Sequence, residues 1–170
     1  SFIKMPILPP HAFEVFSHSP EQTRRVGIRL GSLLQVGDII CLEGDLGSGK
    51  TTLVQGIAQG WGSANKVTSP TYVIVNEYVR PGGNTLFHCD AYRLQPENPL
   101  DSAIIDLDRV FSGGVLVIEW AERMKTSLPK ENLWIQMDWI NPDQRHLILT
   151  PHGHRYESIL IKLQQALFGG

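Results

Sequence analysis

Two short runs of continuous apolar residues, 39–42 and 115–118, stand out in the hydrophobic pattern of the chain. Runs of this length without alternation are typical of strands buried on both faces, as in the middle of a parallel sheet. Further strands are predicted from β-rich or alternating stretches at residues 12–18, 71–79, 85–89, 133–140 and 146–149. Turn residues at 81–84 and 141–143 should join two pairs of them as hairpins.

Between these strands lie segments in which apolar residues recur at helical spacing. Val26, Leu30, Leu33 and Leu34 form one such stripe, and the segment before it carries start signals. Ser19 can cap the helix, Pro20 suits its first position, and Gln22 can complete a capping box. Three further helical stretches are predicted, at residues 51–61, 155–168 and, as one or two short helices, 96–110.

A glycine-rich segment lies between the first buried strand and the helix that follows it. It satisfies the pattern G-x-x-x-x-G-K-[ST] in full, as Gly44, Asp45, Leu46, Gly47, Ser48, Gly49, Lys50 and Thr51. Glycines let the backbone turn and approach phosphate oxygens, and the helix points its positive end at the same place. Lys50 supplies a charge for the β- and γ-phosphates, and Thr51 offers a hydroxyl to Mg²⁺. The segment therefore predicts a site for ATP with magnesium.

The predicted fold is α/β, a three-layer sandwich of the P-loop NTPase type, with a mixed sheet that is parallel at its core and antiparallel at its edges. Strands alternate with helices early in the chain, whereas hairpins come later. We expect one P-loop ATPase domain over residues 1–170, with residues 1–10 as a flexible arm because they hold three prolines.

Acidic residues end two of the predicted strands. Glu119 follows the second buried run, where a P-loop site usually places an acid that holds the metal or its water. Asp90 ends the strand at 85–89 and is a candidate to face the γ-phosphate, with His88 on the same side of that strand. Which of the two acids orients the attacking water stays open. Thr71, in the turn Ser69-Pro70-Thr71, is a candidate sensor of the γ-phosphate.

Charge and composition narrow the function classes. The chain has 15 Lys and Arg against 17 Asp and Glu, a formal net charge of −2, without the basic footprint of a protein that grips nucleic acid alone. If RNA is involved, we expect a partner to hold it. We read Cys41 and Cys89 as reduced and buried. Neither a leader nor an apolar run of roughly 20 residues is evident, so we expect a cytoplasmic protein without membrane contact.

The motifs together resemble the TsaE family (also YjeE-like), the P-loop ATPases of tRNA threonylcarbamoyladenosine synthesis. Four stretches carry the resemblance, in order and spacing: residues 44–52, Ser69-Pro70-Thr71-Tyr72 with Asn76-Glu77-Tyr78, His88-x-Asp90-x-Tyr92-Arg93-Leu94, and Ile118-Glu119-Trp120. The resemblance covers residues 19–145. It implies slow ATP hydrolysis, stimulated by the partner proteins TsaD and TsaB, with tRNA reached through those partners.

The resemblance also implies roles for individual residues. Lys50 and the loop backbone, through Thr52, hold the phosphates of ATP or ADP, while Thr51 and Glu119 serve Mg²⁺. Thr71 and Asp90 match switch-like positions around the γ-phosphate. Three further residues match positions around the nucleotide or metal: Thr23, Trp120 and Arg145. Small packing departures, such as Ala121 where proline is common, leave this chemistry intact.

Two other functions compete with a switch ATPase. A small-molecule kinase would use the same P-loop, but such kinases need an acceptor pocket and usually a lid that bears arginines, and the arginines here are scattered. A non-enzymatic module would hold nucleotide only as a structural ligand. Guanine specificity of the small-GTPase kind is disfavoured, because residues 65–68 lack the Asp of the N-K-x-D pattern and come too early in the chain.

Overall fold

The computed structural model describes residues 8–45, 47–63, 65–68, 75–95, 97–98 and 105–169. Its strands are β1 (Phe13–Ser17), β2 (Ile39–Gly44), β3 (Asn65–Thr68), β4 (Val75–Val79), β5 (Thr85–Asp90), β6 (Gly114–Glu119), β7 (Asn132–Asn141) and β8 (Gln144–His152). Its helices are α1 (Pro20–Leu33), α2 (Lys50–Trp61), α4 (Leu107–Gly113) and α5 (His154–Phe168), with a 3₁₀ helix η1 (Ala121–Ser127).

In the described part of the chain, all strands belong to one eight-stranded sheet in the order β1-β8-β7-β2-β6-β5-β4-β3. The inner strands β7, β2, β6 and β5 run parallel to one another, and the outer strands pair antiparallel. This confirms the predicted mixed sheet. The carboxyl ends of β2, β6 and β5 therefore meet at one edge, the place where open α/β sheets bind ligands.

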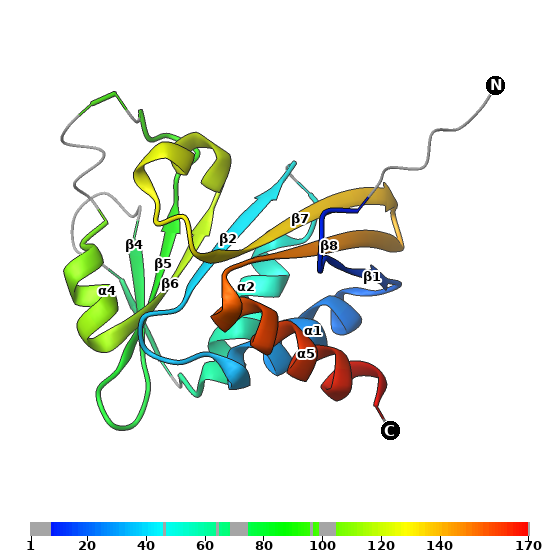
Figure 1. Ribbon diagram of the computed structural model, residues 1–170, viewed down its shortest axis with the longest axis horizontal. Coiled ribbons are helices and arrows are strands. Elements are labelled where there is room, and N and C mark those ends of the chain that lie inside the picture. The colour runs from blue at the N-terminus through cyan, green and yellow to red at the C-terminus, as the bar shows by residue number, and fades with distance from the viewer. Residues whose placement is uncertain are drawn as a thin grey trace.

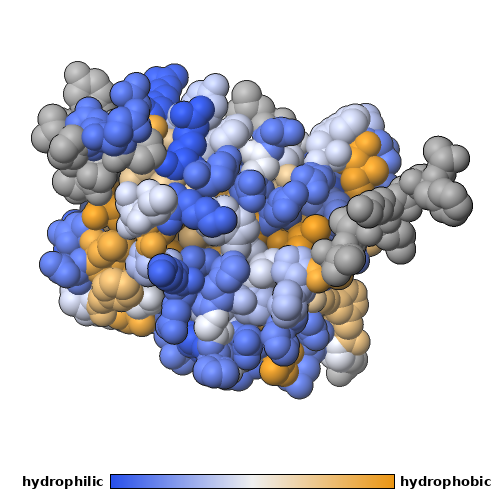
Figure 2. Space-filling view, turned by 45° about the horizontal axis from the view of Figure 1, so that its top comes forward, coloured by the Kyte–Doolittle hydropathy of each residue, from blue (hydrophilic) through white to orange (hydrophobic). Residues whose placement is uncertain are grey.

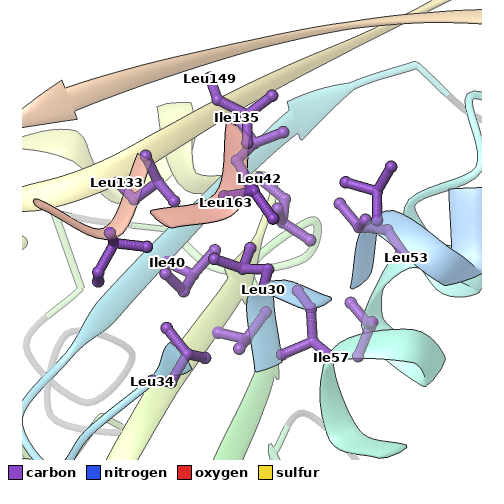
Figure 3. Close-up of a cluster of buried hydrophobic side chains, with 14 of the residues drawn as sticks. Leu30, Leu34, Ile40, Leu42, Leu53, Ile57, Leu133, Ile135, Leu149 and Leu163 are labelled. Atoms are coloured by element: carbon purple, nitrogen blue, oxygen red, sulfur yellow. The ribbon is translucent and has the colours of Figure 1, made fainter. Parts of the chain in front are cut away.

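Alternate residues of the buried strands face two separate cores. In β2, Ile40 and Leu42 join the core under α1, α2 and α5, whereas Ile39 and Cys41 join the core under α4 and η1. Figure 3 shows the first core, where leucines and isoleucines of the sheet meet those of the helices. Figure 1 shows α1, α2 and α5 gathered beside β2, β7 and β8, with α4 at the β4–β6 side. Helices thus cover both faces, as a three-layer sandwich requires.

Helices α1 and α2 touch through their backbones. A Cβ added at Gly31 would lie 2.1 Å from the Ile57 carbonyl oxygen, and one at Gly60 would lie 2.0 Å from that of Ile28. Gly27 and Gly56 meet the facing helix in the same way. Real Cβ atoms do not come this close to backbone, so the four glycines set the spacing of the two helices. This contact fixes α2, which begins at the glycine-rich loop.

Several expectations are confirmed, and two elements were missed. Ser19 caps α1 by accepting from the Gln22 N–H, but the Gln22 side chain accepts from the His18 N–H instead of from Ser19. Strand β3 and helix η1 were not predicted. Of the helical stretch predicted at 96–110, residues 96 and 99–104 lie outside the described residues, and α4 covers its end and continues to Gly113. Both cysteines are free and buried, as expected, and burial raises the pKa of each thiol to about 12.

Several large apolar side chains are exposed, among them Phe16, Phe111, Trp139, Ile161 and Phe168. Figure 2 shows apolar residues as separate islands on a face that is otherwise largely hydrophilic. Among the described helices, none combines the length and the apolar character needed to cross a membrane.

Candidate nucleotide site

The glycine-rich loop follows the central strand β2 and leads directly into α2. Gly47 and Gly49 adopt φ values of +81° and +99°, in the left-handed region that favours glycine. At Gly44 an added Cβ would lie 2.4 Å from the Met137 carbonyl oxygen and 2.9 Å from Ser48 Oγ. Backbone conformation therefore favours glycine at Gly47 and Gly49, and close packing requires it at Gly44.

The N-terminus of α2 faces this loop without a side-chain cap, because its cap residue is Gly49. The first N–H groups of a helix have no partner within the helix, and together they favour an anion. Ser48 adds a buried hydroxyl that has no hydrogen-bond partner among the described residues. Thr51 lies exposed and Thr52 half-buried on the first turn. These groups form a cradle of donors, which we call the phosphate cradle (44–45 and 47–52).

Lys50 folds back over the cradle. Its ammonium donates to the carbonyl oxygens of Gly44 and Asp45 and lies 3.9 Å from the centre of the Trp120 ring. Burial lowers the pKa of Lys50, and nearby carboxylates, above all Glu119, oppose that shift. Among the described residues, this buried ammonium is hydrogen-bonded only to neutral carbonyls, and a charged acceptor such as a phosphate oxygen would make a stronger bond.

Glu119 and Asp90 end adjacent parallel strands and are paired in register. Glu119 is buried, and one of its oxygens lies 2.6 Å from Nε2 of His88. Asp90 is exposed, and one of its oxygens accepts the N–H of Tyr92 in a local turn. The structure therefore brings both predicted acids to the edge of the cradle but places them in different environments.

Trp120 adopts a backbone conformation that is rare for a large side chain, with φ +57° and ψ +40°. This turn carries its ring under the Lys50 ammonium and within 4.9 Å of the Tyr92 ring centre. Strained residues of this kind cluster at functional sites. The ring therefore packs against the cradle lysine as well as against the core.

A pocket adjoins the other side of the α2 N-terminus. Its lining includes Thr23, Gly49, Thr52 and Arg145, together with Ser19, Pro20, Pro142 and Asp143. The Thr23 hydroxyl is hydrogen-bonded to that of Ser17 at 2.7 Å, and Arg145 is held by carbonyls of its own hairpin, Asn141 at 2.8 Å among them. Thr23 and Arg145 are far apart in sequence, and the fold places both beside the cradle.

The residues present fit a magnesium-bound triphosphate. Four carboxylates, those of Glu119, Glu122, Asp90 and Asp45, lie near the Lys50 ammonium and raise its pKa against the effect of burial. Burial raises the pKa of Glu122, and the charge of Glu43 adds to that rise. Within the described ranges, no group of three or more His, Cys, Asp or Glu side chains is placed to hold a metal ion by itself. A metal here would thus need phosphate oxygens, waters and the Thr51 hydroxyl beside Glu119, which is how Mg²⁺ commonly binds.

Comparison with known proteins decides the family. The family described as Threonylcarbamoyl adenosine biosynthesis protein TsaE matches residues 17–147. The chain belongs to the TsaE family. It is 38% identical over 148 residues to the tRNA threonylcarbamoyladenosine biosynthesis protein TsaE of Bacillus subtilis, covering 86% of this chain and 90% of that one. It is 40% identical over 139 residues to that of Streptomyces coelicolor, covering 78% and 93%.

The fold of this TsaE-family chain also matches a solved structure. The crystal structure of YdiB from Bacillus subtilis superposes with a TM-score of 0.73 at 32% sequence identity, covering 91% of this chain and 95% of that one. The match spans nearly the whole length of both chains, so the two chains share one fold.

Most of the predicted site residues of this TsaE-family chain come together at one edge of the sheet. Thr23, Arg145, Trp120 and the two acids all surround the cradle. Leu46 and Thr71 lie outside the described residues, so their predicted roles stay predictions. Sequence reasoning noted His88 for its side of the strand and as part of the stretch His88-x-Asp90-x-Tyr92-Arg93-Leu94, but did not foresee its bond to Glu119. It predicted Ser48 as one of the loop residues that hold phosphate, and it did not single out the pocket residue Asp143.

Proposed function

We propose that this chain is a magnesium-dependent ATPase that serves as an accessory subunit in tRNA threonylcarbamoyladenosine synthesis. The observation that carries the proposal is the meeting of Lys50, the uncapped N-terminus of α2 and the buried Glu119 at one edge of the sheet. A cationic donor, aligned backbone donors and a metal-directed carboxylate are the parts that phosphoryl chemistry on a nucleotide requires.

The roles follow from position. The cradle backbone and Lys50 hold the β- and γ-phosphates, while Thr51 and Glu119 hold Mg²⁺, which neutralises charge on the phosphate oxygens when it is bound. Thr52, Thr23 and Arg145 line the pocket that takes the α-phosphate and nucleoside end of ATP or ADP. Thr71 and Asp90 are proposed to respond to the γ-phosphate.

Partners complete the proposal. The relatives are named for tRNA threonylcarbamoyladenosine biosynthesis, and we assign TsaD and TsaB as the proteins that this chain drives or resets. The net charge of −2 gives little attraction for a polyanion, so tRNA is reached through those partners. Intrinsic hydrolysis is slow, and docking of the partners accelerates it.

A reconstituted assay tests the proposal. Calorimetry with Mg·ATP and Mg·ADP measures binding to the protein alone, and phosphate release is then compared with and without TsaD, TsaB and tRNA. We expect binding by the protein alone and faster hydrolysis with partners. Absence of any nucleotide affinity would overturn the site itself. Rapid transfer of a labelled γ-phosphate to a small metabolite would instead identify a kinase, and binding without turnover in the full mixture would identify a structural ligand.

A further inference from the structure

The side chains of His88 and Glu119 form a buried pair beside the phosphate cradle. They come from neighbouring parallel strands, where His88 lies opposite Val117 and Asp90 lies opposite Glu119, so the pair is diagonal across β5 and β6. Nε2 lies 2.6 Å from Oε2, with the side chains only 12% and 10% exposed. An ionised carboxylate can only accept, so the imidazole donates from Nε2.

We propose that His88 is a positioning residue that fixes the Glu119 carboxylate toward the metal end of the nucleotide; this rests on the proposed function. The hydrogen bond holds Oε2, and no hydrogen bond to Oε1 is found among the described residues. A glutamate has three rotatable side-chain bonds, and one at a strand end can otherwise turn toward solvent. Partners behind a metal-directed carboxylate orient it in this way in many metal sites.

An ion pair between the buried Asp38 and the half-buried Arg155 shows what a purely structural contact looks like. Asp38 at the opposite end of β2 accepts two hydrogen bonds from Arg155 and one from the Gln35 N–H, and Arg155 also donates to the Leu33 carbonyl. Both carboxylate oxygens of Asp38 are used there, and Arg155 ties α5 to the start of β2 and to α1. His88 instead leaves its Nδ1 buried without a hydrogen-bond partner among the described residues. A buried nitrogen without a partner lowers stability, so stability does not explain a histidine at this position. Orientation of the Glu119 carboxylate does explain it.

Two substitutions at His88 distinguish a donor at the position of Nε2 from a donor at the position of Nδ1. In His88→Gln the amide nitrogen reaches about as far as Nε2 and can still donate to Glu119. In His88→Asn the shorter amide reaches only about as far as Nδ1 and cannot. Three quantities are measured for each variant. They are the Mg²⁺ concentration at which the effect of Mg²⁺ on ADP affinity is half-maximal, the affinity for ADP without metal, and the melting temperature.

We expect His88→Asn to raise the half-saturating Mg²⁺ concentration by roughly 10- to 100-fold. His88→Gln should restore it to within about threefold of the unsubstituted protein, and metal-free ADP affinity should stay unchanged in both. Equal behaviour of the two variants, or a parallel loss of metal-dependent and metal-free binding, would overturn the inference, because a structural role does not distinguish the two nitrogens.

Glu119→Gln separates this inference from the function on which it rests. If Glu119→Gln leaves the Mg²⁺ dependence unchanged, the assigned metal role of Glu119 is wrong, and the role of His88 fails with it. If Glu119→Gln shifts the dependence but His88→Asn does not, only the inference about His88 fails. We expect His88→Asn to have no further effect when Glu119→Gln is already present. The reason is that His88 acts through the Glu119 carboxylate, so it has no effect on metal binding once that carboxylate is gone.

Discussion

The phosphate cradle and the acidic strand ends meet at one edge of the sheet but are built differently. The cradle consists mainly of backbone groups, and its helix α2 is held against α1 by glycines whose neighbours are carbonyl oxygens 2.0–2.5 Å from where a Cβ would lie. The acidic edge, which is formed by Asp90 at the end of β5 and Glu119 at the end of β6, consists of side chains. Glu119 depends on one hydrogen bond from His88, and Asp90 is exposed and bonded only to a nearby turn among the described contacts.

This difference predicts how each region responds to substitution. An added Cβ at Gly44 or in the glycine contact of α1 and α2 must move backbone, so stability is lost before chemistry can be measured. A substitution at the acidic edge leaves the backbone in place and changes what the site does to a metal and its phosphate. Atoms added at the glycine contact should therefore lower the stability of the protein, whereas substitutions at the acidic edge should change its activity.

The largest effect is expected from Gly60→Ala in the glycine contact. Alanine gains about 1 kcal/mol of helix propensity, but its Cβ would lie 2.0 Å from the Ile28 carbonyl oxygen. Separating the helices should cost about 3 kcal/mol or more, so the clash wins. Urea unfolding measures the change. Gly113→Ala in α4 is the control, since an added Cβ there meets nothing within 4 Å. Equal stability of the two variants would contradict the close contact of α1 and α2.

Lys50→Ala should give the next largest effect, this time on binding. The ammonium is the one positive side chain that folds over the cradle among the described residues, and its charge-assisted bonds to phosphate are worth about 3 kcal/mol in total. We expect the affinity for Mg·ADP to fall by on the order of 100-fold. Calorimetry checks this, with the exposed Lys162→Ala as control. A loss in both variants would point to general electrostatics and not to the cradle.

Local patterns in the sequence were enough to place the cradle. The motif at residues 44–51, the apolar run before it and the helical stripe after it agree with one another, and β2 and α2 lie where these signals put them. The buried run that becomes β6 and the acid at its end were found for the same reason. Such elements depend on residues close together in the chain.

Contacts between distant segments were harder to predict. The bond between His88 and Glu119 depends on the register of β5 against β6, which the hydrophobic pattern of either strand alone does not fix. The glycines of α1 and α2 were visible at four-residue spacing in both helices, but that they face each other is a property of the packed fold. Strand β3 was missed because Asn65–Thr68 is short and lacks an apolar run.

Comparison of Glu119→Gln with Asp90→Asn sharpens the account of the acidic edge. Both change one carboxylate to an amide of the same shape, on adjacent strands in register. Glu119 is buried, so its charge is little screened, whereas Asp90 is exposed and already caps a turn. We expect ATP turnover with partners to fall on the order of tenfold for Glu119→Gln and at most about threefold for Asp90→Asn. The reverse order would assign the attacking water to Asp90.

The smallest effect concerns pH and connects the two regions through Lys50. Burial lowers the pKa of Lys50, so its ammonium loses its proton at a lower pH than an exposed lysine does. Phosphate binding needs the protonated form, and the affinity for ADP measured across alkaline pH should therefore fall at a lower pH than it would for a lysine with the ordinary pKa of 10.5. Lys50→Arg is the matched control, because a guanidinium stays charged over this range and its affinity should be flat, even if weaker overall. If Glu119→Gln also steepens the fall, the carboxylate at the acidic edge supports the charge of the cradle lysine; an unchanged slope would show that the two regions act separately on the nucleotide.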